Sequence, residues 1–237
     1  WLHQAQWRKD INVLQLVPHW NWPTDSIGKN IKVMALSNAD SVKILLNGKM
    51  ISGQKVDKYE MNTWQVPYKP GKLEAVGYKN GKEVARFKAE TTGNPVSLQL
   101  VPDRNYLDGN GWDAMPVAVK ALDAKGREVP TANLMVEFAI NPNALIIGLG
   151  NGDPNSHEPE KGNKRSLFNG LAQVIIQSTE GSEGFIELTA TAEGMKPARI
   201  SIPVKKVNSI PSVPVITSGI VLSNWRISPF SNNRPDA

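Results

Sequence analysis

The sequence of 237 residues contains no cysteine, so it can form no disulfide, no thiolate metal site and no cysteine nucleophile. It also contains no run of 18 apolar residues, the length that a membrane-spanning helix needs, and we expect no membrane partner. Long helices are disfavoured as well, because 19 Gly and 17 Pro interrupt the chain often. Zero cysteine fits a periplasmic or secreted protein, which is the expected location, but it fits a cytosolic one too.

A focused stripe of basic residues is also missing. Lys and Arg total 27 against 22 Asp and Glu, a net charge of +5, and no basic cluster is longer than two consecutive residues, as at Lys205-Lys206. Proteins that bind nucleic acids usually concentrate Lys and Arg on one face, so we expect no nucleic-acid partner. The 40% of hydrophobic residues suffices for a buried core, which leaves a β-rich globular protein.

Short alternating runs predict a first immunoglobulin-like β-sandwich over residues 24–92. Ile31 to Leu36 alternates like a strand, and Val42 to Ile51 contains Asn47-Gly48, the dipeptide of a tight hairpin turn. A second hairpin is predicted around Asn80-Gly81. Strands at this spacing without an intervening helix indicate a sandwich of about seven strands.

A second immunoglobulin-like sandwich is predicted over residues 93–207, after the break at Gly93-Asn94-Pro95. The fold class is therefore all-β, with two tandem sandwiches. Residues 1–23 are interpreted as a short N-terminal remnant and linker. Residues 208–237 are interpreted as an extended, Pro-rich linker towards a missing module, in which residues 220–227 could form one more strand.

The first candidate site is the aromatic segment His19-Trp20-Asn21-Trp22. If the segment is extended, Trp20 and Trp22 share one side and offer a flat surface to the C–H groups of a sugar, with His19 beside them. The alternative is that both indoles fill the seam between two domains, because large aromatic side chains are mostly buried.

The second candidate site is the connection from Gly148 to Gly170, which is long enough to suggest a function. Oxygen atoms of Asn151, Asp153 and Glu158 could bind a hard cation such as calcium, with His157 nearby, although the spacing is neither an EF-hand nor a phosphate-binding loop. The alternative is a surface loop with ordinary turn chemistry.

No catalytic set and no metal site are predicted from motifs. The sequence lacks a His-Glu-x-x-His helix motif and a Gly-x-Ser-x-Gly elbow. Glycoside hydrolysis needs two carboxyls that face each other across a sugar. The glutamates on predicted strands and hairpins are each explained by a solvated outer face: Glu60, Glu74, Glu83, Glu90, Glu137 and Glu187.

Three segments resemble, in the correct order, the C-terminal non-catalytic region of bacterial glycoside hydrolase family 2 enzymes of the β-galactosidase type. They are residues 13–22, residues 35–49, and residues 148–159 together with Phe168-Asn169-Gly170. The resemblance implies that both catalytic glutamates of a retaining glycosidase lie on a barrel upstream of Trp1, so none is assigned here. It also implies that Trp1 to Trp7 is a remnant of the last barrel helix and that an indole of the aromatic segment lines the sugar pocket.

The leading hypothesis is therefore an accessory region whose partners are its own upstream catalytic barrel and β-galactoside glycans, with self-association as an additional expectation. Relatives that act on glucuronides or mannosides share this modular plan, so the sugar stays open. The alternative is a non-enzymatic carbohydrate-binding or cell-surface adhesion module, because fold does not determine function. A third hypothesis, sugar binding by the second domain, predicts a fluorescence change at Trp112. The basic run Lys161 to Arg165 has no predicted chemical role.

Overall fold

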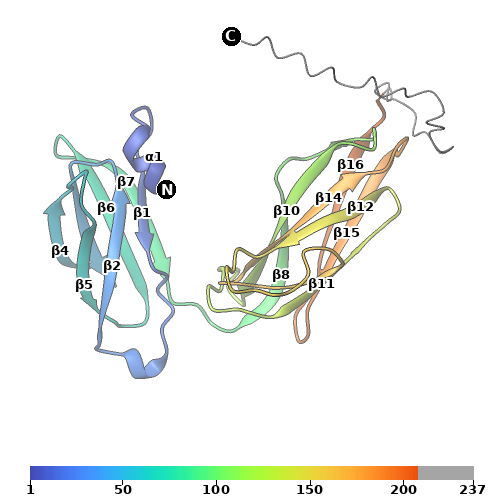
Figure 1. Cartoon of the computed structure of the whole chain (residues 1–237). Helices are drawn as coiled ribbons and strands as arrows, with labels where there is room; N and C mark the ends of the chain where they lie inside the picture. Colours follow the sequence, from blue (N-terminus) through green and yellow to red (C-terminus); the bar gives the residue numbers. More distant parts are fainter. Residues whose placement is uncertain (208–237) are drawn as a thin grey trace, which may run out of the picture.

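The computed structural model describes residues 1–207, which form two antiparallel β-sandwiches in tandem (Figure 1). The predicted fold class, all-β with two immunoglobulin-like sandwiches, is confirmed. The predicted linker and the predicted strand at residues 220–227 lie outside the described residues. Within residues 1–207, no helix has the length and apolarity to cross a membrane.

The first sandwich has seven strands in two sheets. One sheet contains β1 (Leu14–Val17), β2 (Asn30–Ser37) and β5 (Asn62–Pro67), in the order β1-β2-β5. The other contains β3 (Ser41–Leu46), β4 (Lys49–Lys55), β6 (Lys72–Lys79) and β7 (Lys82–Glu90), in the order β4-β3-β6-β7. Alternate residues of facing strands fill the core between the sheets, for example Val33 and Ala35 from β2 against Val42 and Ile44 from β3.

Strand β1 belongs to this first sandwich, which corrects the sequence-based boundary at residue 24. It pairs with β2 over its whole length, from Leu14 opposite Ser37 to Val17 opposite Met34. Leu14 and Leu16 point into the core, so residues 1–23 do more than link the sandwich to what precedes it.

Both predicted Asn-Gly hairpins of the first sandwich are confirmed. Asn47 and Gly48 join β3 to β4 with φ values of 52° and 79°. Asn80 and Gly81 join β6 to β7 with φ values of 49° and 78°. Two successive positive φ values match the twist of antiparallel strands, which is why this dipeptide could be recognised from sequence.

The edge strand β4 differs from its neighbours in burial. Only one of its seven residues, Ser52, is even partly buried, and lysines stand at both of its ends, Lys49 and Lys55. A register shift interrupts its pairing with β3 between Ile44 and Leu45. The strand is therefore polar, exposed and irregular at the border of its sheet.

The second sandwich has nine strands in two sheets. One sheet contains β8 (Pro95–Pro102), β10 (Ala114–Asp123), β12 (Ala144–Gly150) and β14 (Leu171–Ser178), in the order β12-β14-β10-β8. The other contains β9 (Leu107–Asp108), β11 (Met135–Ile140), β13 (Lys164–Ser166), β15 (Gly184–Thr191) and β16 (Ala198–Lys205), in the order β13-β11-β15-β16-β9. Its core is separate from that of the first sandwich and includes Val117, Phe138 and Ile186.

A short helix, α1 (Leu2–Trp7), lies against the first sandwich, and a 3-10 turn, η1 (Thr24–Ser26), follows β1. Ala5 of α1 is buried, and the side-chain amide of Gln6 donates a hydrogen bond of 2.6 Å to the carbonyl of Lys58. The helix leaves Trp1 and Trp7 exposed, at 64% and 73% of their surface.

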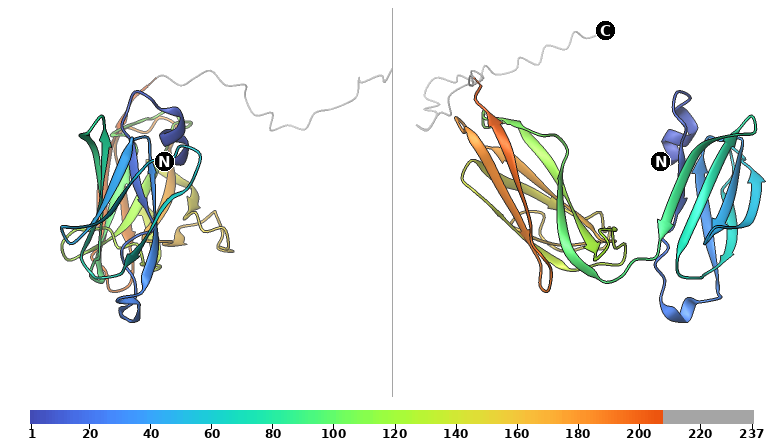
Figure 2. Two further views of the ribbon diagram at one scale, coloured as in Figure 1. Left: turned by 90° about the vertical axis from the view of Figure 1, so that its left-hand side faces the viewer. Right: turned by 180° about the vertical axis from the view of Figure 1, so that it is seen from behind.

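The two sandwiches are joined by residues 91–94, between the end of β7 and the start of β8 (Figure 2, right). We call these four residues the connector. A connector this short keeps the sandwiches close together, and side chains of both contact it.

Candidate functional site

Trp20 of the aromatic segment is a core residue of the first sandwich. Its side chain is 0% exposed, its Nε1 donates a hydrogen bond of 3.0 Å to the carbonyl of Lys69, and its ring meets the ring of Tyr68 edge-on at 5.1 Å. A fully enclosed indole offers no face to a sugar, so the predicted platform of two neighbouring indoles is not formed. The alternative interpretation, that the indole is buried, applies to Trp20, but Trp20 lies in the core of the first sandwich and not in the seam between two domains.

His19 and Trp22 form the ring pair that the structure does bring together. Their ring centroids are 5.2 Å apart with an angle of 32° between the planes. The backbone amide of Asn21 donates to His19 Nδ1 at 3.1 Å, and half-burial lowers the pKa of the imidazole. Trp22 is partly buried and packs against the core of the first sandwich, to which Trp20 also belongs. A role for His19 and Trp22 in sugar contact stays a prediction.

A cleft of about 540 Å³ lies where the two sandwiches meet, a size that is ordinary for small-ligand sites. It is bordered by the end of β1 with its following turn, by β7 and the connector, and by the second sandwich: Gln15, Leu16, Pro18, His19, Trp20, Phe87, Lys88, Ala89, Glu90, Thr92, Arg127, Glu128 and Pro130. No sequence pattern indicates this cleft, because its lining residues come from three distant segments and share no motif.

The second candidate site, the connection from Gly148 to Gly170, is tied down by its own polar side chains. Asn151 accepts a hydrogen bond from Arg165 Nη2 at 3.0 Å and donates one to the carbonyl of Ser166 at 3.0 Å. Arg165 Nη1 donates to the carbonyl of Glu158 at 2.9 Å. The backbone amide and hydroxyl of Ser166 both donate to the Glu158 carboxylate, and these bonds lower its pKa.

This network corrects two expectations about the connection. It is not structureless, because β13 forms within it and pairs with β11. The basic run also has a role, because the buried Arg165 anchors the loop. Asp153 accepts a hydrogen bond from the amide of Asn155 at 2.9 Å, and His157 is exposed.

In the described part of the chain, no cluster of ligands supports the predicted cation site. Across residues 1–207, no three Asp, Glu or His side chains converge as ligands of a metal ion would. The oxygens of Asn151 and Glu158 instead accept hydrogen bonds from the loop itself. A calcium site, or any other function of this loop, stays a prediction.

The most buried carboxylates of the described chain are held in ion pairs. Glu74, which we expected on a solvated face, is buried and lies 3.0 Å from Lys72 Nζ and 3.5 Å from Arg86 Nη1. Asp123 Oδ2 lies 2.6 Å from Arg127 Nη2, and the hydrogen bonds that Asp123 accepts from Arg127 hold the pKa of its carboxyl well below the usual range. A glycosidase needs one carboxyl with a raised pKa to act as an acid, and the environment of Asp123 acts in the opposite direction.

Comparison with known families assigns both sandwiches. Residues 98–201 match the family Glycoside hydrolase family 2 C-terminal domain 5. Residues 28–85 match a domain of unknown function, DUF4982. The two matches fall within the second and the first sandwich, respectively.

Similar whole proteins are much longer than this chain. It is 36% identical over 209 residues to Beta-galactosidase BoGH2A of Bacteroides ovatus, which covers 87% of this chain and 24% of that protein. It is 28% identical over 210 residues to a beta-glucuronidase of Formosa agariphila, with 84% and 20% covered. A glycosyl hydrolase family 2 crystal structure from Bacteroides cellulosilyticus superposes with a TM-score of 0.79 at 29% identity, over 86% of this chain and 30% of that one. The chain thus spans about a quarter or less of these two curated relatives.

Proposed function

We propose, on the premise that this chain is a C-terminal region of a glycoside hydrolase family 2 enzyme, that its two sandwiches support the catalytic domain of a retaining glycosidase of the β-galactosidase type. The observation that carries this proposal is the order of the matches. Both sandwiches align, one after the other, with the C-terminal part of much longer hydrolases. A supporting role needs a surface that contacts the catalytic domain and needs no reactive centre of its own.

An apolar face on the first sandwich supplies such a surface. Leu2 of α1 and Met61 border a small hollow. Met61 also borders a neighbouring groove of about 320 Å³, together with Val17 and Met34. Leu2, Val17 and Met61 are exposed in the described chain. Large apolar side chains grouped in this way mark an interaction surface, and we assign it to the preceding catalytic domain.

We also propose that this region alone does not hydrolyse glycosides, and the ion pairs of its most buried carboxylates support this. Glu74 and Asp123 are engaged by Lys and Arg side chains, so neither is poised as a general acid. We expect the purified chain to release no nitrophenol from nitrophenyl β-galactoside or nitrophenyl β-glucuronide. Turnover of either substrate that is lost on mutation of a residue of this chain would overturn the assignment as an accessory region.

The supporting role is tested in the full-length enzyme by a matched pair of substitutions. Met61 on the apolar face and Met50 on β4 are equally exposed, each at 61%. We expect Met61→Asp to lower the thermal midpoint and the activity of the full-length enzyme, because it places a charge in the interface. Met50→Asp is expected to leave both unchanged. Equal effects of the two substitutions, or none from Met61→Asp, would contradict the proposed interface.

A second proposed function is contact with the glycan substrate at the cleft between the sandwiches. His19 lines this cleft and its ring packs against the ring of Trp22, which is the observation that favours this function. Galactosides at high millimolar concentration should then shift the imidazole resonances of His19 and alter the fluorescence of Trp22. A change at Trp112, 67% exposed on the second sandwich, would instead support sugar binding by the second domain. Resonances of His19 that stay in place would exclude this contact.

A further inference from the structure

We propose that the side chains of Asp123 and Arg127, in a turn of the second sandwich, hold the connector in place, so that the two sandwiches move as one rigid body. We call the side chains of Asp123 and Arg127 the clamp. This inference concerns the joint between the sandwiches and does not depend on the proposed function. Domains joined by a short linker usually move relative to each other unless a large apolar interface holds them. Here the two hydrophobic cores are separate clusters, so any restraint has to come from polar contacts at the joint.

The first half of the connector is bonded to the first sandwich. The amide of Thr91 donates to the carbonyl of Gly71 at 2.8 Å, and its hydroxyl donates to the carbonyl of Trp20 at 2.7 Å. Thr92 and Asn21 exchange two hydrogen bonds: the Thr92 amide donates to Asn21 Oδ1 at 2.6 Å, and Asn21 Nδ2 donates to Thr92 Oγ1 at 2.7 Å. The chain therefore leaves the first sandwich in a fixed direction.

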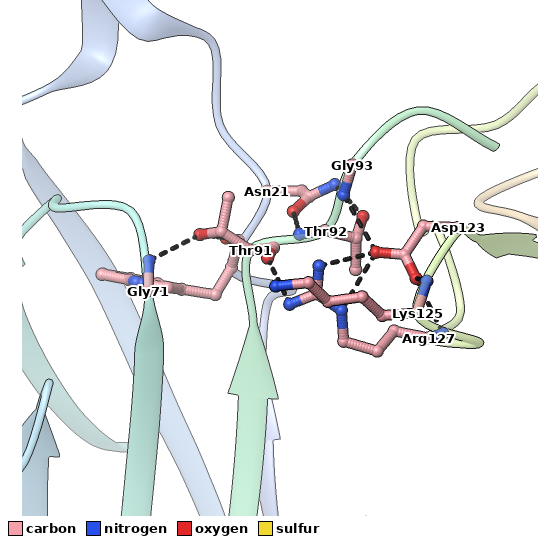
Figure 3. A network of polar contacts seen from close by, with 9 residues as sticks. Asn21, Gly71, Thr91, Thr92, Gly93, Asp123, Lys125 and Arg127 are labelled. Carbon is pink, nitrogen blue, oxygen red and sulfur yellow. Dashed lines mark hydrogen bonds and ion pairs between the residues drawn. The ribbon is translucent and has the colours of Figure 1, made fainter.

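The clamp binds the connector from the side of the second sandwich (Figure 3). Arg127 Nη1 donates to the carbonyl of Thr91 at 2.9 Å, and the amide of Gly93 donates to Asp123 Oδ2 at 3.0 Å. Thr91 is thus held by both sandwiches at once, through its amide and hydroxyl on one side and its carbonyl on the other. Rotation of either sandwich about the connector would break bonds on both sides of it.

The clamp itself is built as a rigid unit. The Asp123 side chain is only 2% exposed, and its Oδ2 accepts from Arg127 Nε at 3.0 Å and from Nη2 at 2.6 Å. Its Oδ1 accepts from the backbone amides of Lys125 and Arg127, each at 2.9 Å. A guanidinium that binds a carboxylate with two donors has little freedom to turn, so its third donor is aimed at the connector.

The absence of cysteine from the chain makes the joint directly measurable. Lys49→Cys on β4 and Glu193→Cys in the turn before β16 place one spin label on each sandwich, at exposed positions. Pulsed dipolar spectroscopy then reports the distribution of distances between the labels. For the otherwise unchanged chain we expect one narrow distribution, and a broad one would overturn the proposal.

The clamp is then opened by Arg127→Ala, with Lys125→Ala as the matched control. Both substitutions remove one positive charge from the same turn, but the exposed Lys125 contributes only its backbone amide to the clamp. We expect Arg127→Ala to broaden the distance distribution about twofold, as for domains that move independently, and Lys125→Ala to leave it narrow. An unchanged width in a folded Arg127→Ala protein would overturn the proposal.

Asn21→Ala keeps the test decisive if Arg127→Ala fails to fold. This substitution removes both bonds to Thr92 on the side of the first sandwich and leaves the clamp intact. Broadening on this substitution would again support a joint held by polar bonds. A narrow distribution, with circular dichroism of a folded protein, would show that the connector is not what fixes the two sandwiches.

Discussion

At the scale of single residues, burial decides which aromatic side chains matter for stability. Trp20 is enclosed by the first core, donates to Lys69 and meets Tyr68 edge-on, whereas Trp112 is mostly exposed. Because both residues are tryptophans, any difference in stability between their alanine variants comes from their environments.

Trp20→Ala should lower the free energy of unfolding by about 4 kcal/mol, because it removes a large ring and leaves a cavity. Trp112→Ala is expected to change it by less than about 0.5 kcal/mol. Urea unfolding of both variants measures the difference. Similar midpoints for the two proteins would mean that Trp20 is not a core residue.

His19 should make stability depend on pH. Half-burial lowers its pKa below the ordinary value of 6.5, so the unfolded chain binds a proton that the folded chain resists. The contribution of His19 is therefore fully present above pH 6.5 and is lost as the pH falls through the lowered pKa of the folded state. Urea unfolding between pH 8 and pH 5 measures this slope, and His19→Asn should reduce it. Titration of the His19 ring protons at or above pH 6.5 would contradict the expectation.

At the scale of elements, the loop that follows β12 owes its order to one buried cation. Arg165 on β13 holds the side chain of Asn151 and the backbone of Glu158, while the neighbouring Lys164 points to solvent and pairs with Glu137. The short strand thus positions a guanidinium where the loop needs donors.

Arg165→Ala should loosen this loop. We expect faster amide hydrogen exchange across residues 151–163 and a loss of about 2 kcal/mol in unfolding free energy, because buried acceptors are left without a donor. Lys164→Ala, one residue away and exposed, is the matched control and should change neither quantity by much. Equal exchange rates in both variants would show that the loop is ordered by something else.

The elements that the sequence predicts correctly are those with local signals. Asn47-Gly48 and Asn80-Gly81 indicate hairpins because two adjacent residues fix the turn. The sequence-based boundary at residue 24 leaves β1 outside the sandwich, because its partner β2 follows only after a Pro- and aromatic-rich turn. Membership of a sheet depends on contacts between distant segments, and no short pattern encodes them.

The same limit explains the sites. The bonds of Arg127 to Thr91 and of Asp123 to Gly93 join residues that are 36 and 30 positions apart, so no local pattern indicates them. The buried Arg165 was visible only as part of a basic run, which usually signals solvent exposure. For Asn151 and Glu158, the sequence identifies polar residues in an unusual loop, but not that they accept hydrogen bonds from Arg165 and Ser166 of β13.

At the scale of the whole molecule, two cores imply two units of folding. The residues packed around Ile44 and those packed around Ile186 form separate clusters. Calorimetry should therefore resolve two transitions. Ile44→Ala should lower only the transition of the first sandwich, and Ile186→Ala only that of the second, each by about 2–5 kcal/mol in unfolding free energy. A single transition that shifts equally in both variants would show that the two units unfold together.

The exposed border strand β4 also affects how copies of the molecule meet at high concentration. An open sheet margin is a template on which another chain can add a strand and begin a fibril. The terminal lysines Lys49 and Lys55 and the irregular pairing with β3 make that addition unfavourable, because incoming backbones meet charge and a broken register. Strand β4 thus contributes almost nothing to the interior of the first sandwich, but it makes the molecule resistant to aggregation.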